Sequence, residues 1–407
     1  MSLLPVEDAL QRLLAAAAPP ARSELVGLHE AQGRVLAADI TATLTQPPFD
    51  SSAMDGYALR HADLAAGAAL RVIGRSAAGH AFRGTVGPGE TVRIFTGAPV
   101  PEGADTVLLQ EDAEISGDGA TIRATFTPAA GRHIRPRGQD FAEGEAVLKA
   151  GDLLDAGRLT VAAAMNHPYL PVYLRPKVAI LATGDELVEP GKTPAHGQIV
   201  ASNSYGIAAL ARDAGAEVLD LGIAGDDAAA ILDAVDWARA CGADVLVTLG
   251  GASVGDHDIV QPVLTGAGMA LDFWRIAMRP GKPLMVGRLG AMQVLGLPGN
   301  PVSSLVCSLL FLEPLIRTLA RLPAIDRRAT AVTETDLAEN DKRQDYLRAR
   351  LRRGADGALL ATPFGKQDSS MMKTFARSEC LILRRPHAPA LSAGSPCEVV
   401  VLREPSA

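Results

Sequence analysis

The chain has 407 residues, of which 48% are hydrophobic and 21% charged, and its formal net charge is −7 at pH 7. A length of this order predicts two to four domains of roughly 100 to 200 residues each, with the composition of an ordinary globular protein rather than a disordered or collagenous one. The negative charge argues against nonspecific nucleic-acid binding as the main task, because such binding needs cations clustered over a whole face.

Cysteine usage and the N-terminal segment bear on the cellular compartment. Cys241, Cys307, Cys380 and Cys397 stand far apart, with no CxxC pair and no HExxH motif, which predicts neither a zinc ribbon nor a disulfide framework. The segment MSLLPVEDALQRLL lacks a basic region and a cleavage site, so it predicts an amphipathic helix rather than a signal peptide. We find no stretch that we expect to span a bilayer. These features predict a cytoplasmic protein.

The first half of the chain predicts two short helices followed by strands. Helical periodicity covers residues 5–17, and a second small helix is expected near 28–36. Between about residues 69 and 154, short apolar runs alternate with Gly and Pro turns, which predicts a β-rich domain. A helical pattern returns at 155–166, and the proline-rich HPYLPVYLRP that follows predicts a linker.

From about Lys177 the chain alternates strands and helices. This order predicts βαβ units in a parallel sheet with helices on both faces, a three-layer α/β domain. Pro301 suits a first helical position, and the apolar length that follows it predicts a buried helix. After about Pro323, short strands with charged or Gly turns predict a small β-sandwich or barrel of about 80 residues.

Four loops follow predicted strands of the α/β domain and are candidates for phosphate binding. They are TGDE at 183–186, AGDD at 224–227, GGASVGDHD at 250–258 and LPGNPVSS at 297–304. Ligands of open parallel sheets bind beyond the carboxyl ends of the strands, where glycine lets backbone N–H groups approach a phosphate at a helix start. The expected phosphate-loop residues are Gly250, Gly251, Ser253, Gly255, Gly299 and Asn300.

Three acids of these loops, Glu186, Asp227 and Asp258, are expected on the same sheet edge. Two like charges about 4 Å apart repel by roughly 4 kcal/mol at an effective dielectric near 20, so a divalent cation or a raised pKa is expected there. Mg²⁺ suits the site because it binds through one or two carboxylates plus substrate phosphates. The alternative is that each acid caps the helix it precedes.

Basic residues and one serine motif give further candidates. Arg275, Arg279 and Lys282 in WRIAMRPGKP could clamp a multiply charged oxyanion, or else lie on a solvated strand edge. The run GRHIRPRG at 131–138 predicts a surface or interface loop, to which we assign no chemistry. GASVG matches a nucleophile elbow at Ser253, but the next helix is expected to begin too late and no suitable histidine follows within the same domain.

Six motifs in order resemble one known family. PPFDSSAMDGYAL, FTGAPVPEGADTV, LATGDELVEPG, TLGGASVGDHD, MRPGKP and GLPGNPVSS resemble the molybdopterin molybdenumtransferase family (MoeA and the E domain of gephyrin), over about residue 28 to the C-terminus. The resemblance implies an α/β multidomain homodimer. Its four domains would be a discontinuous helical domain (1–25 plus 145–176), a β-rich domain (26–144), a three-layer α/β molybdopterin-binding domain (177–327) and a C-terminal β-barrel (328–407).

The reaction implied by the resemblance inserts molybdate into adenylated molybdopterin, with Mg²⁺-dependent release of AMP, giving molybdenum cofactor. A molybdopterin adenylyltransferase is the expected upstream partner. The alternative function is a noncatalytic, gephyrin-like scaffold that binds pterin or partner peptides. Residue by residue, the resemblance points to catalytic polar groups at Asp55, Thr96, Glu186, Asp227 and Asp258, and to oxyanion ligands at Arg275, Arg279, Lys282, Arg348 and Ser369.

Two departures from the family pattern affect the oxyanion ligands. The family commonly has Lys at the position of Arg279, which preserves charge but changes geometry. It commonly has Gly before the serine aligned with Ser369, where this chain has Asp368, whose carboxylate would repel molybdate if it faced the site. Because Asp55 and Thr96 belong to the β-rich domain, the family's dimer implies a composite site to which Asp55 is contributed in trans.

Overall fold

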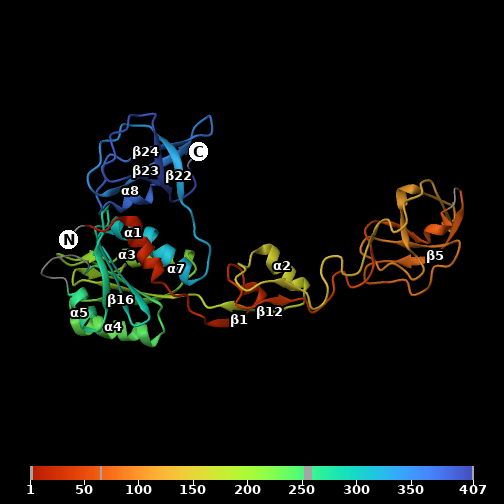
Figure 1. Ribbon diagram of the computed structural model, residues 1–407, viewed down its shortest axis with the longest axis horizontal. Helices are drawn as coiled ribbons and strands as arrows, with labels where there is room; N and C mark the ends of the chain where they lie inside the picture. Colours follow the sequence, from red (N-terminus) through yellow and green to blue (C-terminus); the bar gives the residue numbers. More distant parts are fainter. Residues whose placement is uncertain (1–2, 65–66, 252–258, 406–407) are drawn as a thin grey trace. The chain divides into compact units, whose positions relative to one another are not determined.

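The computed structural model describes residues 3–64, 67–251 and 259–405. The predicted site residues Ser253, Gly255 and Asp258 therefore lie outside the described residues. The chain divides into two compact units, Met1–Arg22 with Tyr173–Ala407, and Ser23–Val172. Each unit is described by itself (Figure 1).

The first unit is built on a six-stranded sheet with the order β16-β13-β17-β21-β20-β18. Its parallel strands are β13 (Lys177–Thr183), β16 (Glu217–Ala224), β17 (Val245–Leu249) and β21 (Met292–Leu297). The prediction of a parallel sheet is wrong at one side, where β20 (Pro283–Leu289) pairs antiparallel with both β21 and β18 (Ala270–Arg275). The turn at Gly290, with φ of 67°, closes the β20–β21 hairpin, whereas a parallel pair needs a long crossover.

Helices cover both faces of this sheet, which confirms the predicted three layers. Alternate residues of β13 divide between two cores: Val178 and Ile180 face one, Ala179 and Leu181 the other. The first core receives α1 (Val6–Ala15) and α3 (Asn203–Asp213), and the second receives α4 (Ala228–Ala240) and α5 (Val260–Gly266). In Figure 1, α4 and α5 lie together on one side of the sheet, opposite α1 and α3.

A long buried helix follows β21 and begins at Pro301, as predicted. It consists of α6 (Pro301–Cys307), a π-helical turn (Ser308–Leu312) and α7 (Glu313–Leu319). The sequence-based expectation that no segment could span a bilayer is wrong on length and composition alone, because Pro301–Leu319 has a mean hydropathy of 1.6. In the described part of the chain, however, 72% of that segment is buried inside the protein, which is typical of a core helix.

The C-terminal part of the first unit is a closed β-barrel, as predicted. Its strands are β22 (Arg328–Thr333), β23 (Gln344–Arg353), β24 (Leu359–Pro363), β25 (Cys380–Arg384) and β26 (Pro396–Val401). The order β23-β24-β22-β26-β25 closes because β25 also pairs with β23. The short strand β19 (Met278–Arg279) pairs with β23 and joins the barrel to the segment between β18 and β20.

The second unit contains a β-rich sheet and a smaller core. The sheet has the order β7-β4-β6-β5-β9-β8, formed by β4 (Gly56–Leu59), β5 (Ala69–Ser76), β6 (Glu90–Ile94), β7 (Thr106–Leu109), β8 (Ala113–Ile115) and β9 (Thr121–Ala124). The smaller core contains α2 (Ala156–Ala164), the ribbon of β1 (Ser23–Gly27) with β12 (Tyr169–Tyr173), and the pair β2 (Ile40–Thr41) and β11 (Ala146–Leu148).

The helix expected near 28–36 is wrong. Only Leu28–Glu30 forms a 3₁₀ turn, after which Val35 and Leu36 form bridges to Leu153 and Val172. Buried Val35 and Leu36 thus serve as extended partners of distant segments, an outcome that local periodicity does not reveal. The four-domain boundaries stay a prediction; residues 1–22 belong to the unit that contains the α/β sheet.

Candidate functional site

A cavity of about 710 Å³ opens at the carboxyl ends of β13, β17 and β21. Part of its wall is apolar and comes from Leu187 of β14 (Leu187–Val188), Ile199 and Val200 of β15 (Ile199–Val200), and Met372 of α8 (Met372–Ala376). The lining also includes residues with polar side chains or bare backbone, among them Thr183, Glu186, Ser202, Asn203, Gly250, Gly299, Asn300 and Ser370. The predicted sheet edge is therefore hollowed into a ligand-sized site.

The glycines bring the ends of three strands, β13, β17 and β21, into close contact at the cavity edge. Gly250 has φ of 97°, and a Cβ added there would lie 2.7 Å from the carbonyl oxygen of Thr183. A Cβ on Gly299 would lie 3.8 Å from the Gly250 Cα, and Asn203 Nδ2 donates to the Gly299 carbonyl at 2.7 Å. Glycine at these positions leaves backbone, rather than side chains, exposed to a ligand.

Of the three acids predicted for the sheet edge, Glu186 alone is placed in the cavity by the described residues. It is exposed, and a Cβ on Gly184 would collide with its carboxylate. Asp227 is instead the N-cap of α4, since its carboxylate accepts from Ala229 N at 3.2 Å and Ala230 N at 3.3 Å. For Asp227, the alternative that the acid caps the helix it precedes is therefore confirmed.

Asp185 is a residue that the sequence analysis did not single out. Its Oδ1 accepts from the backbone N–H of Asp226 at 3.0 Å, which ties the loop after β13 to the loop after β16. The adjacent acids of TGDE thus differ in role: one holds neighbouring loops together and the other lines the cavity. The sequence signal, two adjacent acids after a strand, does not say which acid faces which way.

Arg348 is buried in the barrel with 2% of its surface exposed. Its Nη1 donates to Tyr346 O at 3.3 Å and its Nη2 to Asp368 O at 3.4 Å, while its Nε has no hydrogen-bond partner among the described residues. Burial lowers the pKa of the Arg348 guanidinium, and the carboxylates of Asp345 and Asp368 partly offset this. Arg348 is thus a buried cation with an unused donor.

The other predicted cations are placed differently. Arg275 and Lys282 are exposed, and their carbonyl groups accept from Leu4 N at 3.2 Å and Ile276 N at 3.3 Å. Arg279 is ion-paired with Asp341 and Asp345 of the barrel. A hydrogen bond to Asp345 raises the pKa of the Arg279 guanidinium. Arg279 is thus already paired with acids of the barrel, whereas Arg275 and Lys282 are exposed, and the predicted oxyanion clamp stays a prediction.

In the barrel loop before α8, Ser370 rather than Ser369 lines the cavity. The carbonyl of Ser369 accepts from Val302 N at 3.1 Å. The Asp368 carboxylate accepts from Ser370 N at 2.8 Å and Ser370 Oγ at 2.6 Å, and these bonds lower the pKa of Asp368. The Asp368 carboxylate, which would repel an oxyanion if it faced the site, is therefore hydrogen-bonded to Ser370 within its own loop.

In the second unit, Asp55 and Thr96 are brought together although 41 residues separate them. The Asp55 carboxylate accepts from Thr96 N at 2.8 Å and Thr96 Oγ1 at 2.7 Å. The backbone hydrogen bond from Thr96, then its hydroxyl, lower the pKa of Asp55. Asp55 is therefore an ionised acceptor at neutral pH, held at the end of the loop that precedes β4.

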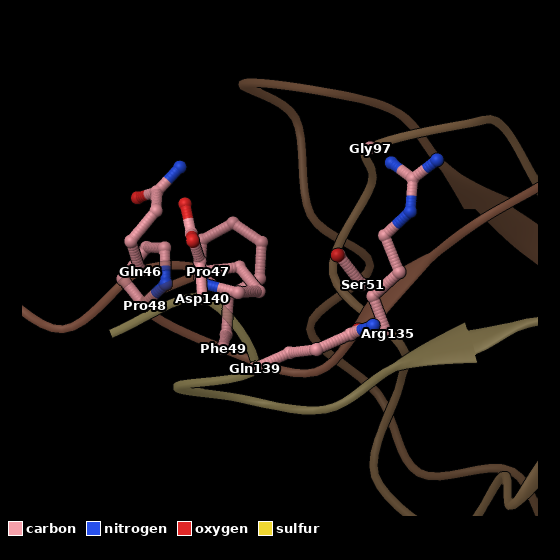
Figure 2. Close-up of a pocket in the computed structure, with 9 residues that line it drawn as sticks. All are labelled: Gln46, Pro47, Pro48, Phe49, Ser51, Gly97, Arg135, Gln139 and Asp140. Carbon is pink, nitrogen blue, oxygen red and sulfur yellow. The ribbon is translucent and has the colours of Figure 1, made fainter. Parts of the chain in front are cut away.

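A pocket of about 540 Å³ lies near the start of the QPPFDSS motif in the same unit. Figure 2 shows Gln46, Pro47 and Asp140 on one side of it and Ser51, Gly97 and Arg135 on the other. Strand pairing places Arg135 of β10 (Ile134–Arg135) opposite Ser51 of β3 (Ser51–Ser52). The basic run to which we assigned no chemistry therefore contributes a cation to a pocket, together with the unpredicted Asp140.

The donor set of the cavity suits a hard cation only in part. Within residues 3–64, 67–251 and 259–405, no group of three or more His, Cys, Asp or Glu side chains could hold a metal. Mg²⁺ needs only one or two carboxylates when substrate phosphates supply other oxygens. Glu186 beside the glycine edge fits that requirement, whereas Asp227 would first have to give up its capping bonds.

Three family models match successive parts of the chain. Family models match as the MoeA N-terminal region (domain I and II) over residues 4–166, a probable molybdopterin binding domain over 179–318, and the MoeA C-terminal region (domain IV) over 330–402. Two crystal structures of molybdopterin biosynthesis MoeA protein from Pyrococcus horikoshii superpose with TM-scores of 0.83 and 0.80, at 29% and 26% identity, covering 99% and 98% of this chain and 100% of each structure.

Curated relatives are similar over nearly their whole length. A molybdopterin molybdenumtransferase of Haemophilus influenzae is 36% identical over 394 residues, covering 96% of this chain and 97% of the relative. One of Bacillus subtilis is 32% identical over 411 residues, covering 98% and 94%. The chain therefore belongs to the MoeA family of molybdopterin molybdenumtransferases, enzymes of molybdenum cofactor biosynthesis.

Proposed function

We propose that this protein inserts molybdate into adenylated molybdopterin and releases AMP, giving molybdenum cofactor. The observation that carries the proposal is the cavity at the sheet edge, which is lined both by Glu186 and by a backbone edge formed by Gly250 and Gly299. Such an edge can approach the phosphates of a nucleotide, and the apolar wall at Ile199, Val200 and Met372 can cover a ring system.

The oxyanion would be held on the barrel side of the cavity. We assign molybdate binding to Arg275, Arg279, Lys282, Arg348 and the serine pair Ser369 and Ser370. Ser370 lines the cavity, and the neighbouring Arg348 carries the buried, unused Nε donor. Arginine is suited to the task because its planar fork can donate two hydrogen bonds to one oxyanion.

Mg²⁺ would be held by Glu186 and the substrate phosphates, with Asp258 and Asp227 as further candidate ligands. When bound, it would offset the negative charge that develops as the phosphoanhydride is cleaved. Glu186 would keep the phosphates oriented against the glycine edge, and the apolar wall would exclude water from the ring system.

We assign the active form to a cytoplasmic homodimer with a composite site. Asp55 and Thr96, with the pocket that contains Arg135 and Asp140, would face the cavity of the partner subunit. Support comes from the polar groups of that second unit, where Thr96 holds an ionised Asp55 and where Arg135 and Asp140 line a pocket. A molybdopterin adenylyltransferase would supply the substrate.

The direct experiment incubates the purified protein with adenylated molybdopterin, Mg²⁺ and molybdate, and measures AMP together with reconstitution of a molybdenum enzyme. We expect AMP release that depends on molybdate and Mg²⁺ and is lost in Glu186→Gln. Glu189→Gln is the matched control, since Glu189 is exposed and is not among the residues lining the cavity. No AMP release under any condition would contradict the proposal.

A further inference from the structure

Arg279 is already paired with acidic residues of the same chain, and the proposed oxyanion would have to compete with them for its guanidinium. Arg279 Nη1 lies 3.3 Å from Asp341 Oδ2, and its Nη2 pairs with Asp345 and contacts Asn340 Oδ1 at 3.5 Å. These partners come from β23 and the loop that precedes it, in the barrel. An oxyanion that binds Arg279 therefore competes with carboxylates of the same chain.

The two carboxylates hold Arg279 with unequal strength. The Asp345 side chain is 6% exposed, and register places Asp345 opposite Arg279 across the β19–β23 pair. The Asp341 side chain is 45% exposed, and its 3.3 Å contact with Arg279 is longer than the roughly 2.7–2.9 Å of a strong charge-assisted bond. The Asp345 contact is thus the fixed one, and the Asp341 contact is the exchangeable one.

Asp341 is paired with a second cation, Arg343, at the same time as with Arg279. Its Oδ2 lies 3.1 Å from Arg343 Nη2, and its Oδ1 accepts from Arg343 N at 2.8 Å. If Asp341 lost its contact with Arg279, its carboxylate would still have a hydrogen-bond partner in Arg343. Asp345 is held more firmly, because its side chain is buried and its Oδ1 has no hydrogen-bond partner among the described residues, so the bond from Arg279 is needed to satisfy this buried carboxylate.

We infer that Asp341 is an internal counter-ion that occupies the exposed edge of Arg279 until the oxyanion displaces it, which leaves Asp341 paired with Arg343 alone. This inference rests on the proposed function, in which Arg279 binds molybdate. Asp341 then sets how tightly the oxyanion is held, and Asp345 keeps the guanidinium in place throughout. Asp341 is a positioning residue, because it acts on the anion through Arg279.

The same geometry gives a reason for arginine at position 279, where the resembling family commonly has lysine. A guanidinium can keep one nitrogen on Asp345 while it offers the other edge to a ligand. A lysine ammonium is a single point charge, so it has no second edge with which to bind the oxyanion while it stays paired with the acids. We therefore expect Asp341, Asp345 and Arg279 to act together in binding the oxyanion.

Molybdate binding to the full-length protein at fixed ionic strength tests the inference. In Asp341→Asn we expect the Kd to fall about two- to fivefold, the effect of removing one half-exposed ion pair. In Arg343→Gln we expect it to rise by a similar factor, because Asp341 then stays on Arg279. Asp356→Asn, a barrel turn whose carboxylate accepts from Ala358 N at 3.0 Å, is the matched control and should leave the Kd unchanged.

A double variant separates the specific effect from general charge. Asp341→Asn combined with Arg279→Gln should bind molybdate no better than Arg279→Gln alone. The inference is overturned if Asp341→Asn leaves wild-type affinity unchanged or weakens it, or if its benefit persists without Arg279. Absence of molybdate binding in every variant and in the wild type overturns the proposed anion site as well, so the two failures are distinguishable.

Discussion

At the scale of single residues, the hydrogen-bond partners of the acids separate their roles. Asp55 accepts two hydrogen bonds from Thr96 and stays ionised. The Asp227 carboxylate caps the N-terminus of α4, whereas Glu186 lines the cavity. From the sequence we expected Glu186 and Asp227 to share one role at the sheet edge, and we expected Asp55 to act from the β-rich domain. An acid that caps a helix contributes to folding, whereas one that lines a cavity can contact a ligand.

Replacing Thr96 by Val should raise the pKa of Asp55. The two bonds from Thr96 stabilise the carboxylate and lower its pKa, and the variant loses the hydroxyl donor but keeps the backbone donor. The pKa should therefore move part of the way back toward its ordinary value, and the acid limb of the pH–rate profile should move to higher pH. Thr96→Ser, which keeps the hydroxyl, is the control.

A carbon-13 titration of the Asp55 carboxyl group measures this shift directly. An unchanged pKa in Thr96→Val would show that the hydroxyl does not stabilise the carboxylate in solution. A shifted pKa with an unchanged acid limb would show that ionisation of Asp55 does not limit the reaction.

At the scale of secondary-structure elements, close backbone approaches decide where glycine is needed. Gly56 in β4 lies between β6 and β7, and Gly250 follows β17 where it meets the loop after β13. Gly56 allows close strand pairing in the sheet of the second unit, whereas Gly250 allows close approach at the cavity edge. Substitution of the two should therefore have different consequences.

Gly56→Ala should destabilise the second unit. A Cβ at this position would collide with the carbonyl oxygen of Leu108, and β4 cannot move away because strands pair with it on both sides. We expect a loss of about 3 kcal/mol or more in the free energy of unfolding, measured by urea denaturation. Gly27→Ala is the control, because nothing lies within 4 Å of its Cβ. Equal stability of the two variants would contradict the argument.

Gly250→Ala should weaken binding of the adenylated substrate. The new Cβ would lie 2.7 Å from Thr183 O at a φ of 97°, so the loop must shift and the cavity edge with it. We expect the KM for adenylated molybdopterin to rise about tenfold, with a stability cost of about 1–3 kcal/mol. Gly266→Ala, with open space around its Cβ, should change neither quantity. A normal KM in Gly250→Ala would exclude the edge from substrate binding.

At the scale of the whole molecule, the candidate residues divide between two units. Asp55, Thr96, Arg135 and Asp140 belong to Ser23–Val172, whereas Glu186 and the oxyanion ligands belong to the other unit. A composite site in a homodimer is the arrangement by which we propose that both sets act on one substrate. It requires residues from both subunits at every site.

Mixed dimers test this arrangement. Subunits with Asp55→Asn and subunits with Glu186→Gln are each expected to be inactive as homodimers. If Asp55 acts in trans, the heterodimer regains one intact site of two and about half of the wild-type AMP release. Verified heterodimers with no activity would refute contribution in trans, and mixtures that do not exchange subunits are the control.

Much of the fold follows from the sequence alone. Alternating strands and helices from Lys177 onward predicted the three-layer domain, Pro301 marked a helix start, and the short strands after Pro323 predicted the barrel. These features depend on neighbours within a few residues, where periodicity and backbone preference are informative. The order of the six motifs likewise identified the family.

What only the tertiary structure decided are the contacts between distant segments. The antiparallel β18 and β20, the Asp185 bridge to Asp226, and the pairing of Arg279 with Asp341 and Asp345 all join segments that sequence patterns treat separately. A carboxylate in a glycine-rich loop has the same local signature whether it caps a helix, bridges two loops or faces a ligand. Its role follows from the group that packing brings within hydrogen-bonding distance.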